Sequence, residues 1–168
     1  GLSLDAVARA VWGLLLAKYN GRDDVVFGAV QGVRPQEFED LTGIAINTAA
    51  VRVKTKENLS FIDLVKQLHH DAVEMEPHAW FPLGEIQNLS PLKHSLLDHI
   101  LVVQHSDPNK TLAEFGQKIG LQIDRTGFYD HTHFEFNVTV TPGEQLTFTL
   151  IGSGNVYSEN YMDQLAGH

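Results

Sequence analysis

The 168-residue chain contains no cysteine. This absence excludes disulfide bridges, thiolate metal sites and cysteine nucleophiles, and it fits a reducing compartment such as the cytoplasm. Basic side chains are also scarce: 12 Lys and Arg stand against 21 Asp and Glu, which gives a formal charge of −9 at pH 7. We therefore expect no nucleic-acid partner and no anionic membrane surface. No apolar run reaches the length of a membrane span, and no signal peptide is recognisable.

The composition that remains is typical of a folded domain, with 43% hydrophobic and 20% charged residues. A chain of this length is one ordinary domain and can bury a sizeable core. The sequence starts abruptly and stops inside a helical pattern, so we expect it to be a piece of something larger.

Three segments carry clear helix signals. Apolar residues after Ser3 recur at helical spacing and cover almost the whole circumference of a helix. This pattern predicts a buried helix capped by Ser3 and ended by Gly21. Ser60 with Asp63 three positions later predicts the start of a second helix. A closing helix should begin after Ser158.

Runs of apolar or alternating residues bounded by turn residues predict strands at 25–32, 43–53, 98–105, 133–140 and 145–152. Pro142-Gly143 should join the last two strands as a hairpin. Interleaving these strands with the helices predicts an α/β fold, more specifically an α+β sandwich in which helices pack against a mixed sheet.

The pair His69-His70, followed by Glu74, suggests a catalytic base or a metal site. However, His70 and Glu74 lie four apart on the helix face that should point to solvent, where a preorganised catalytic pocket is absent. A stable metal site also needs a third and usually a fourth ligand. His131 and His133 are explained more simply by edge or packed positions. The residues alone thus define no catalytic residue and no metal site.

Five motifs, in order, resemble the condensation domains of nonribosomal peptide synthetases. They are "KYNGRDDVVFGAVQGVRP", "LTGIAINTAAVRV", "PHAWFPLGEI", "LLDHILVVQH" and the ending that starts "HFEFNVTVTPGEQLTF". The sequence departs from the family's pattern where Ala49-Ala50 replaces Leu-Pro, Trp80-Phe81 replaces Asp-Tyr and Glu135 replaces Asp. These departures bear on substrate preference rather than on the fold.

The resemblance implies a lobe like those of chloramphenicol acetyltransferase. The family's catalytic HHxxxDG motif belongs to the preceding N-terminal lobe, and His69-His70 lacks its glycine and its aspartate. Residues 1–168 should therefore be a single C-terminal subdomain, inactive alone. The implied reaction forms an amide bond between aminoacyl and peptidyl thioesters. Donor and acceptor peptidyl carrier proteins bring these on phosphopantetheine arms, and an adenylation domain adjoins.

The same resemblance suggests which residues face the substrate tunnel between the lobes. Two uncharged polar side chains in the middle of one strand need partners, so we expect that strand to form part of the wall, together with the end of the preceding strand. The expected tunnel residues are Asn47, Thr48, Gln31 and Gly32, and the expected contacts to carrier protein or phosphopantetheine are Arg34 and Arg52. The alternative is that the polar pair ties strands or caps a helix, and that the arginines are solvated or paired with acidic neighbours.

Two further interpretations stay open. The chain could be a binding lobe that retains a surface for carrier or partner proteins and self-associates through a bared interlobe face. It could also be a free-standing metal-binding α/β protein, a hypothesis that depends only on its nine histidines.

Overall fold

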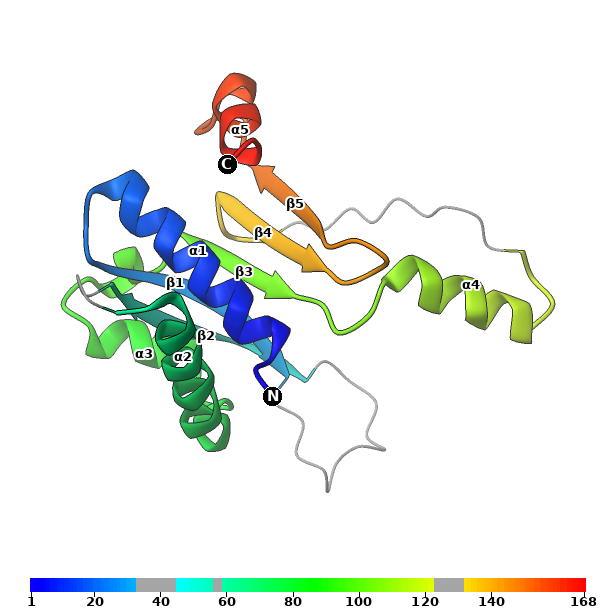
Figure 1. Cartoon of the computed structure of the whole chain (residues 1–168), viewed down its shortest axis with the longest axis horizontal. Coiled ribbons are helices and arrows are strands. Elements are labelled where there is room, and N and C mark those ends of the chain that lie inside the picture. The colour runs from blue at the N-terminus through cyan, green and yellow to red at the C-terminus, as the bar shows by residue number, and fades with distance from the viewer. Residues whose placement is uncertain (33–44, 56–58, 123–131) are drawn as a thin grey trace. The chain divides into compact units, whose positions relative to one another are not determined.

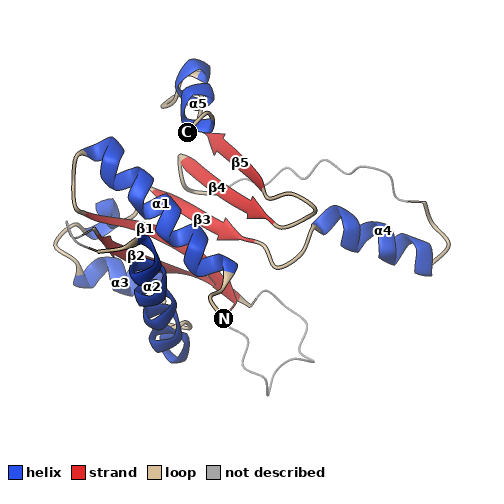
Figure 2. Ribbon diagram, in the orientation of Figure 1, coloured by secondary structure: helices blue, strands red, loops and turns tan. Residues whose placement is uncertain are grey.

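The computed structural model describes residues 1–32, 45–55, 59–122 and 132–168. The chain forms two compact units, Gly1–Val102 and Val103–His168. Figure 1 follows the chain through its elements, and Figure 2 separates helices from strands. Among the described residues, no helix is both long enough and apolar enough to cross a membrane.

The first unit combines helices with a ladder of strands. Strand β1 lies in the middle, antiparallel to β2 and parallel to β3. Helix α1 packs against β1 and β2, and α2 packs beside α1 (Figure 1). In chain order the elements are α1 (Leu4–Asn20), β1 (Asp24–Gly32), β2 (Ile46–Lys54), α2 (Phe61–Met75), η2 (Glu76–His78), α3 (Leu83–Leu89), η3 (Lys93–Leu96) and β3 (His99–Val103).

The helix caps expected from the sequence are present. The Ser3 hydroxyl accepts a hydrogen bond from the Ala6 amide at 3.2 Å, and Gly21 ends α1 in the left-handed conformation at φ 59°. The Ser60 hydroxyl accepts from the Asp63 amide at 3.2 Å and donates to the Asp63 carboxylate at 2.6 Å. Each cap satisfies backbone groups that a helix end leaves free.

Small residues let α1 lie very close to the strands. Its inner stripe, one side of the helix at spacings of three and four, is fully buried and consists of Ala6, Ala10, Gly13 and Ala17. At Gly13 the approach is closest, since an added Cβ would lie 2.7 Å from both Cγ atoms of Val53. Val53 is itself 0% exposed and has no room to give way.

The second unit contains α4 (Pro108–Lys118), β4 (Phe136–Thr141), β5 (Thr147–Gly152) and α5 (Glu159–Ala166). β4 and β5 form the expected antiparallel hairpin. The Ser158 hydroxyl caps α5 by accepting from the Tyr161 amide. Tyr157 packs its ring between those of Phe136 and Tyr161, with centroid distances of 5.4 and 5.9 Å, and so holds α5 to the hairpin.

The structure confirms the expected mixed α/β fold and corrects it in detail. The strand expected from residue 133 begins only at Phe136, because the residues before it form a local turn: the Thr132 hydroxyl accepts from the Phe134 amide at 3.2 Å and donates to the Asn137 Oδ1 at 2.8 Å. Helix α4 was not expected from the sequence. Its signal is the pair Asp107-Pro108, in which the Asp107 carboxylate accepts from the Asn109 amide and Pro108 occupies the first helical position.

We predict that Gly13→Ala destabilises the protein although alanine favours helix. The new methyl group would collide with the buried Val53 side chain, and such overpacking costs about 1–3 kcal/mol. Urea unfolding measures this difference.

Gly84 in α3 provides the matched control, because a Cβ there meets nothing within 4 Å. Gly84→Ala should leave the unfolding free energy unchanged or raise it by up to about 1 kcal/mol. In a Val53→Ala background the cost of Gly13→Ala should fall; an undiminished cost would show that the collision is not its cause.

Candidate functional site

The candidate site lies where β1 ends and β2 begins. The antiparallel register sets Gln31 opposite Asn47 and Val30 opposite Thr48, with Gly32 opposite Ile46 as the last pair. The four residues named from the sequence as tunnel residues therefore meet at one end of the β1–β2 ladder.

Asn47 is a structural tie at this end of the ladder. Its Nδ2 donates to the carbonyl oxygens of Ala79 and Phe81 at 2.8 and 2.7 Å, and its Oδ1 accepts from the Thr48 amide at 2.9 Å. Both amide hydrogens are thus engaged by the turn that follows η2. The side chain holds that turn against the start of β2, whereas the alternative left open by the sequence was a tie between strands or a helix cap.

Asn47 and Thr48 point to opposite faces of the ladder, since successive side chains of a strand alternate. Asn47 shares the helix-bearing face with Val53, which meets α1 at Gly13. The Thr48 methyl lies on the other face, where an added Cβ on Gly28 would meet it at 2.9 Å and the Ile100 side chain at 2.8 Å. One surface of the ladder therefore carries Thr48, and the other carries Asn47.

Gln31 has a buried polar atom that forms no hydrogen bond within the described part of the chain. Directly opposite Asn47, it shares the helix-bearing face. Its Nε2 is buried and finds no acceptor among the described residues. A buried donor left unpaired costs about 1–3 kcal/mol, so an acceptor supplied by a ligand would relieve that cost.

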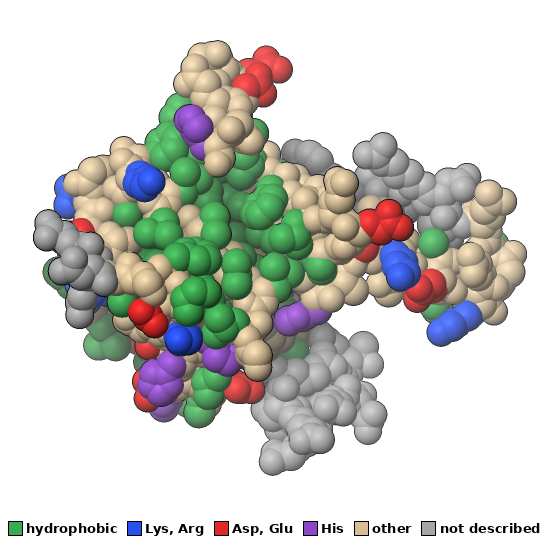
Figure 3. Space-filling view, viewed as in Figure 1, with side chains coloured by type: hydrophobic (Ala, Val, Ile, Leu, Met, Phe, Trp, Pro, Cys, Tyr) green, Lys and Arg blue, Asp and Glu red, His purple; other side chains and the backbone are tan. Residues whose placement is uncertain are grey.

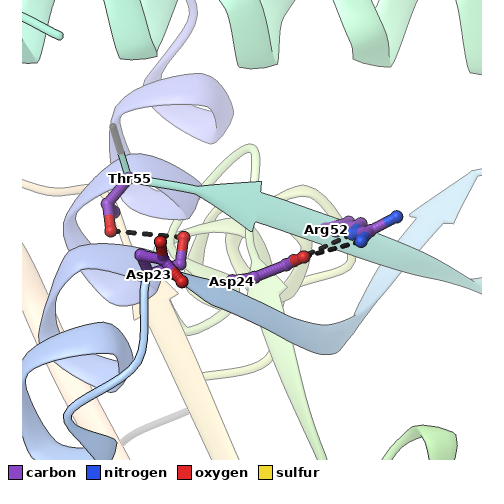
Figure 4. A network of polar contacts seen from close by, with 4 residues as sticks. All are labelled: Asp23, Asp24, Arg52 and Thr55. Carbon is purple, nitrogen blue, oxygen red and sulfur yellow. Dashed lines mark hydrogen bonds and ion pairs between the residues drawn. The ribbon is translucent and has the colours of Figure 1, made fainter. Parts of the chain in front are cut away.

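Arg52 lies further along β2 and is paired with Asp24 of β1. Its Nε and Nη2 donate to the two carboxylate oxygens at 2.8 and 2.6 Å, which makes a bidentate ion pair at the exposed surface (Figure 4). The hydrogen bond from Arg52 lowers the pKa of Asp24 below its ordinary value, and the same bond raises the pKa of Arg52. Beside them, the Thr55 amide and hydroxyl bind the Asp23 carbonyl. Arg34 lies outside the described residues.

The two histidines of α2, His69 and His70, lie at or near the protein surface. His70 and Glu74 approach to 3.4 Å, and both side chains are 69% exposed, as the helical spacing predicted. His69 contacts the Ser3 hydroxyl at 3.4 Å. Of the expected His131 and His133 pair, His131 lies outside the described residues. Over the described ranges, no group of three or more His, Asp or Glu side chains is placed to hold a metal ion.

The buried polar centre of the first unit is His99, the first residue of β3. Its Nε2 accepts a hydrogen bond from the Trp12 indole at 2.9 Å, and its Nδ1 contacts the Asp98 carboxylate at 2.5 Å. The Phe27 ring stacks on it at a centroid distance of 6.1 Å. Since Nε2 accepts, the ring proton is on Nδ1 and points to Asp98. The adjacent Asp-His in the sequence was the available signal, but Trp12 is 87 residues away.

The match to a protein family covers the whole chain: the model of the condensation domain matches residues 1–168. The chain therefore belongs to the condensation domain family. It is 34% identical over 172 residues to gramicidin S synthase 2 of Brevibacillus brevis and 34% identical over 171 residues to bacitracin synthase 3 of Bacillus licheniformis. Each match covers 99% of this chain, which spans only 4% and 3% of those proteins.

Solved structures support the same fold. The starter condensation domain of the rhizomide synthetase RzmA superposes with a TM-score of 0.76 at 16% identity, over 98% of this chain and 40% of that one. The structure of holo T3CT superposes with a TM-score of 0.81 at 20% identity, over 99% of this chain and 40% of that one. At these identities the likeness establishes the fold, and this chain spans about two fifths of each structure.

We predict that Asn47→Ala destabilises the first unit by about 1–3 kcal/mol, because two carbonyl groups lose their donor. Urea unfolding followed by tryptophan fluorescence measures the loss. The control is Asn20→Ala, which removes an exposed bond from Nδ2 to the Leu16 carbonyl within α1 and should cost less than about 0.5 kcal/mol. Equal costs for the two variants would contradict the tying role of Asn47.

A second prediction concerns how the free energy of unfolding changes at acidic pH. The hydrogen bond from His99 lowers the pKa of Asp98 below its ordinary value of 3.8. The folded state thus favours the charged carboxylate, and this stabilisation is fully present above pH 3.8 and is lost as the pH falls through the lower folded value. In urea unfolding, the deficit of Asp98→Asn relative to the wild type should shrink below that pH. A deficit that stays constant from neutral pH into that range would exclude the linkage.

Proposed function

We propose that this chain is the C-terminal subdomain of a condensation domain that joins carrier-bound aminoacyl and peptidyl thioesters by an amide bond. The observation that carries the proposal is the family match over residues 1–168. In the reaction, the amine of the acceptor attacks the carbonyl carbon of the donor thioester. The C–N bond forms, the C–S bond breaks, and the proton lost by the amine balances the thiolate that leaves.

The role of this chain is to position the reactants. Holding two reactants in attack geometry turns a bimolecular step into an effectively unimolecular one and supplies much of the rate enhancement. We assign part of the tunnel wall to the end of the β1–β2 ladder that carries Gln31 and Gly32, with Asn47 fixing the backbone beside them and Thr48 on the opposite face. The Nε2 of Gln31, which finds no acceptor among the described residues, suits a carbonyl oxygen of a bound acyl chain.

The partners follow from the same proposal. They are the N-terminal lobe of the domain, the donor and acceptor peptidyl carrier proteins with their phosphopantetheine arms, and an adjacent adenylation domain in the cytoplasm. Arg34 and Arg52 are the proposed contacts to carrier protein or phosphopantetheine. A phosphate at Arg52 would have to compete with Asp24, whose carboxylate already accepts hydrogen bonds from Nε and Nη2 of the guanidinium.

The chain should not act alone. His70 is exposed and faces Glu74, His69 is half-buried beside the Ser3 hydroxyl, and His99 binds a tryptophan indole and a carboxylate, so none of the three is presented to a substrate as a base. The proton-transfer groups of the reaction are assigned to the N-terminal lobe.

We predict that amide product forms only when this chain is mixed with a companion polypeptide and two loaded carrier proteins. The companion polypeptide is the stretch of gramicidin S synthase 2 that immediately precedes the segment matched by this chain. Mass spectrometry of the thioester-bound product measures the outcome. Product from this chain alone would refute the positioning role, and association without product would favour a lobe that only binds its partners.

Gln31→Met tests the proposed hydrogen bond from Gln31 in the same assay, because methionine keeps the side-chain length and removes the amide donor. Loss of one positioned hydrogen bond should lower the rate by about tenfold, with the unfolding free energy maintained or raised. Gln67→Met on the exposed side of α2 is the control and should react like the wild type. An unchanged rate for Gln31→Met would remove Gln31 from the tunnel wall.

A further inference from the structure

Helix α1 is apolar on the side that faces away from the strands as well as on the side that packs against them. We define its outer stripe as the residues that recur on this outward side at spacings of three and four, namely Leu4, Val7, Val11, Leu15 and Tyr19. Val11 and Tyr19 are 46% and 43% exposed, and the other three are partly exposed. Figure 3 shows apolar side chains gathered over α1 on the viewed face of the first unit.

Of the charged residues within α1, Lys18 alone lies at the spacing of this stripe, in the last turn of the helix, where it is exposed. Asp5 and Arg9 lie on the flank of the helix, where the Arg9 Nε and the Asp5 carboxylate are 2.8 Å apart and Arg9 is only 3% exposed. A helix at the surface of a soluble protein normally turns its charged side chains to water. This helix instead buries its arginine and exposes valine, leucine and tyrosine. An apolar stripe whose single charge, Lys18, lies at one end is typical of a surface that another polypeptide covers.

The shape of the stripe indicates the kind of partner. The stripe is a convex ridge along about four turns of one helix, which fits the groove of another packed element and not the concave pocket that a small ligand requires. The partner therefore presents a complementary apolar groove built from helices or strands.

The identity of the occupant follows from size and charge. This chain spans about two fifths of the condensation-domain structures that share its fold, so most of the polypeptide in such a domain lies outside it. A second copy is less suitable, because two chains of charge −9 repel each other. Resting on the proposed function, we propose that the outer stripe of α1 is the docking surface for the polypeptide that precedes this segment in a condensation domain.

The test measures binding of the companion polypeptide by titration calorimetry. Val11→Glu places a charge in the middle of the stripe at a half-exposed position, so the isolated chain should keep its fold and thermal midpoint. Its affinity for the companion should fall by about tenfold or more, as expected when a charge must be buried at a packed interface. Leu89→Glu is the matched control, since Leu89 at the end of α3 is 80% exposed and outside the stripe; this variant should bind like the wild type.

Three results of the binding experiment would overturn the inference. They are unchanged binding by Val11→Glu, equal losses for Val11→Glu and Leu89→Glu, and no binding by the wild type. A wild-type dimer that Val11→Glu dissolves, with companion binding unaltered, would assign the stripe to a second copy and also overturn it. Failure of the proposed function looks different: the wild-type pair binds, Val11→Glu weakens it, and no amide is formed.

Discussion

The close approach of α1 to the β1–β2 ladder is the constraint on which the first unit depends. Four small residues on the inner stripe of α1 bring the helix backbone next to Val53. This contact decides which face of the ladder is covered, and hence on which face each residue of β1 and β2 lies. The placement of Gln31 and Asn47 on the helix-bearing face and of Thr48 on the other follows directly. A bulkier inner stripe would lift the helix and leave these faces less well defined.

The same helix carries the buried polar centre. Trp12 of α1 donates to His99 of β3, while His99 turns its other ring nitrogen to Asp98. Because each partner of His99 binds a different nitrogen, the ring has one tautomer and one orientation. The hydrogen bond fixes where α1 lies along β3, a position that the small residues of the inner stripe alone would leave free to slide.

The sequence predicted those features that depend on a few neighbouring residues, such as the ends of helices and the face on which a helical residue lies. Ser3, Gly21, Ser60 and Ser158 begin or end helices because a single side chain or a left-handed glycine decides each end, and the spacing of His70 and Glu74 placed them on the solvent face. The sequence did not predict hydrogen bonds between residues that are far apart along the chain. The bonds of Asn47 to carbonyl groups 32 and 34 residues away, and the pairing of Trp12 with His99, depend on a tertiary arrangement that no local pattern encodes.

Asn47 also has a consequence for how the first unit opens. Its amide joins the start of β2 to the turn after η2 and thereby closes a long stretch of chain that includes all of α2. Opening α2 away from the ladder at this end requires both hydrogen bonds to break together. Amide protons in α2 and at the start of β2 should therefore share one opening event in hydrogen exchange, as members of a single cooperative unit. One asparagine side chain thus couples the dynamics of a strand to those of the helix that follows it.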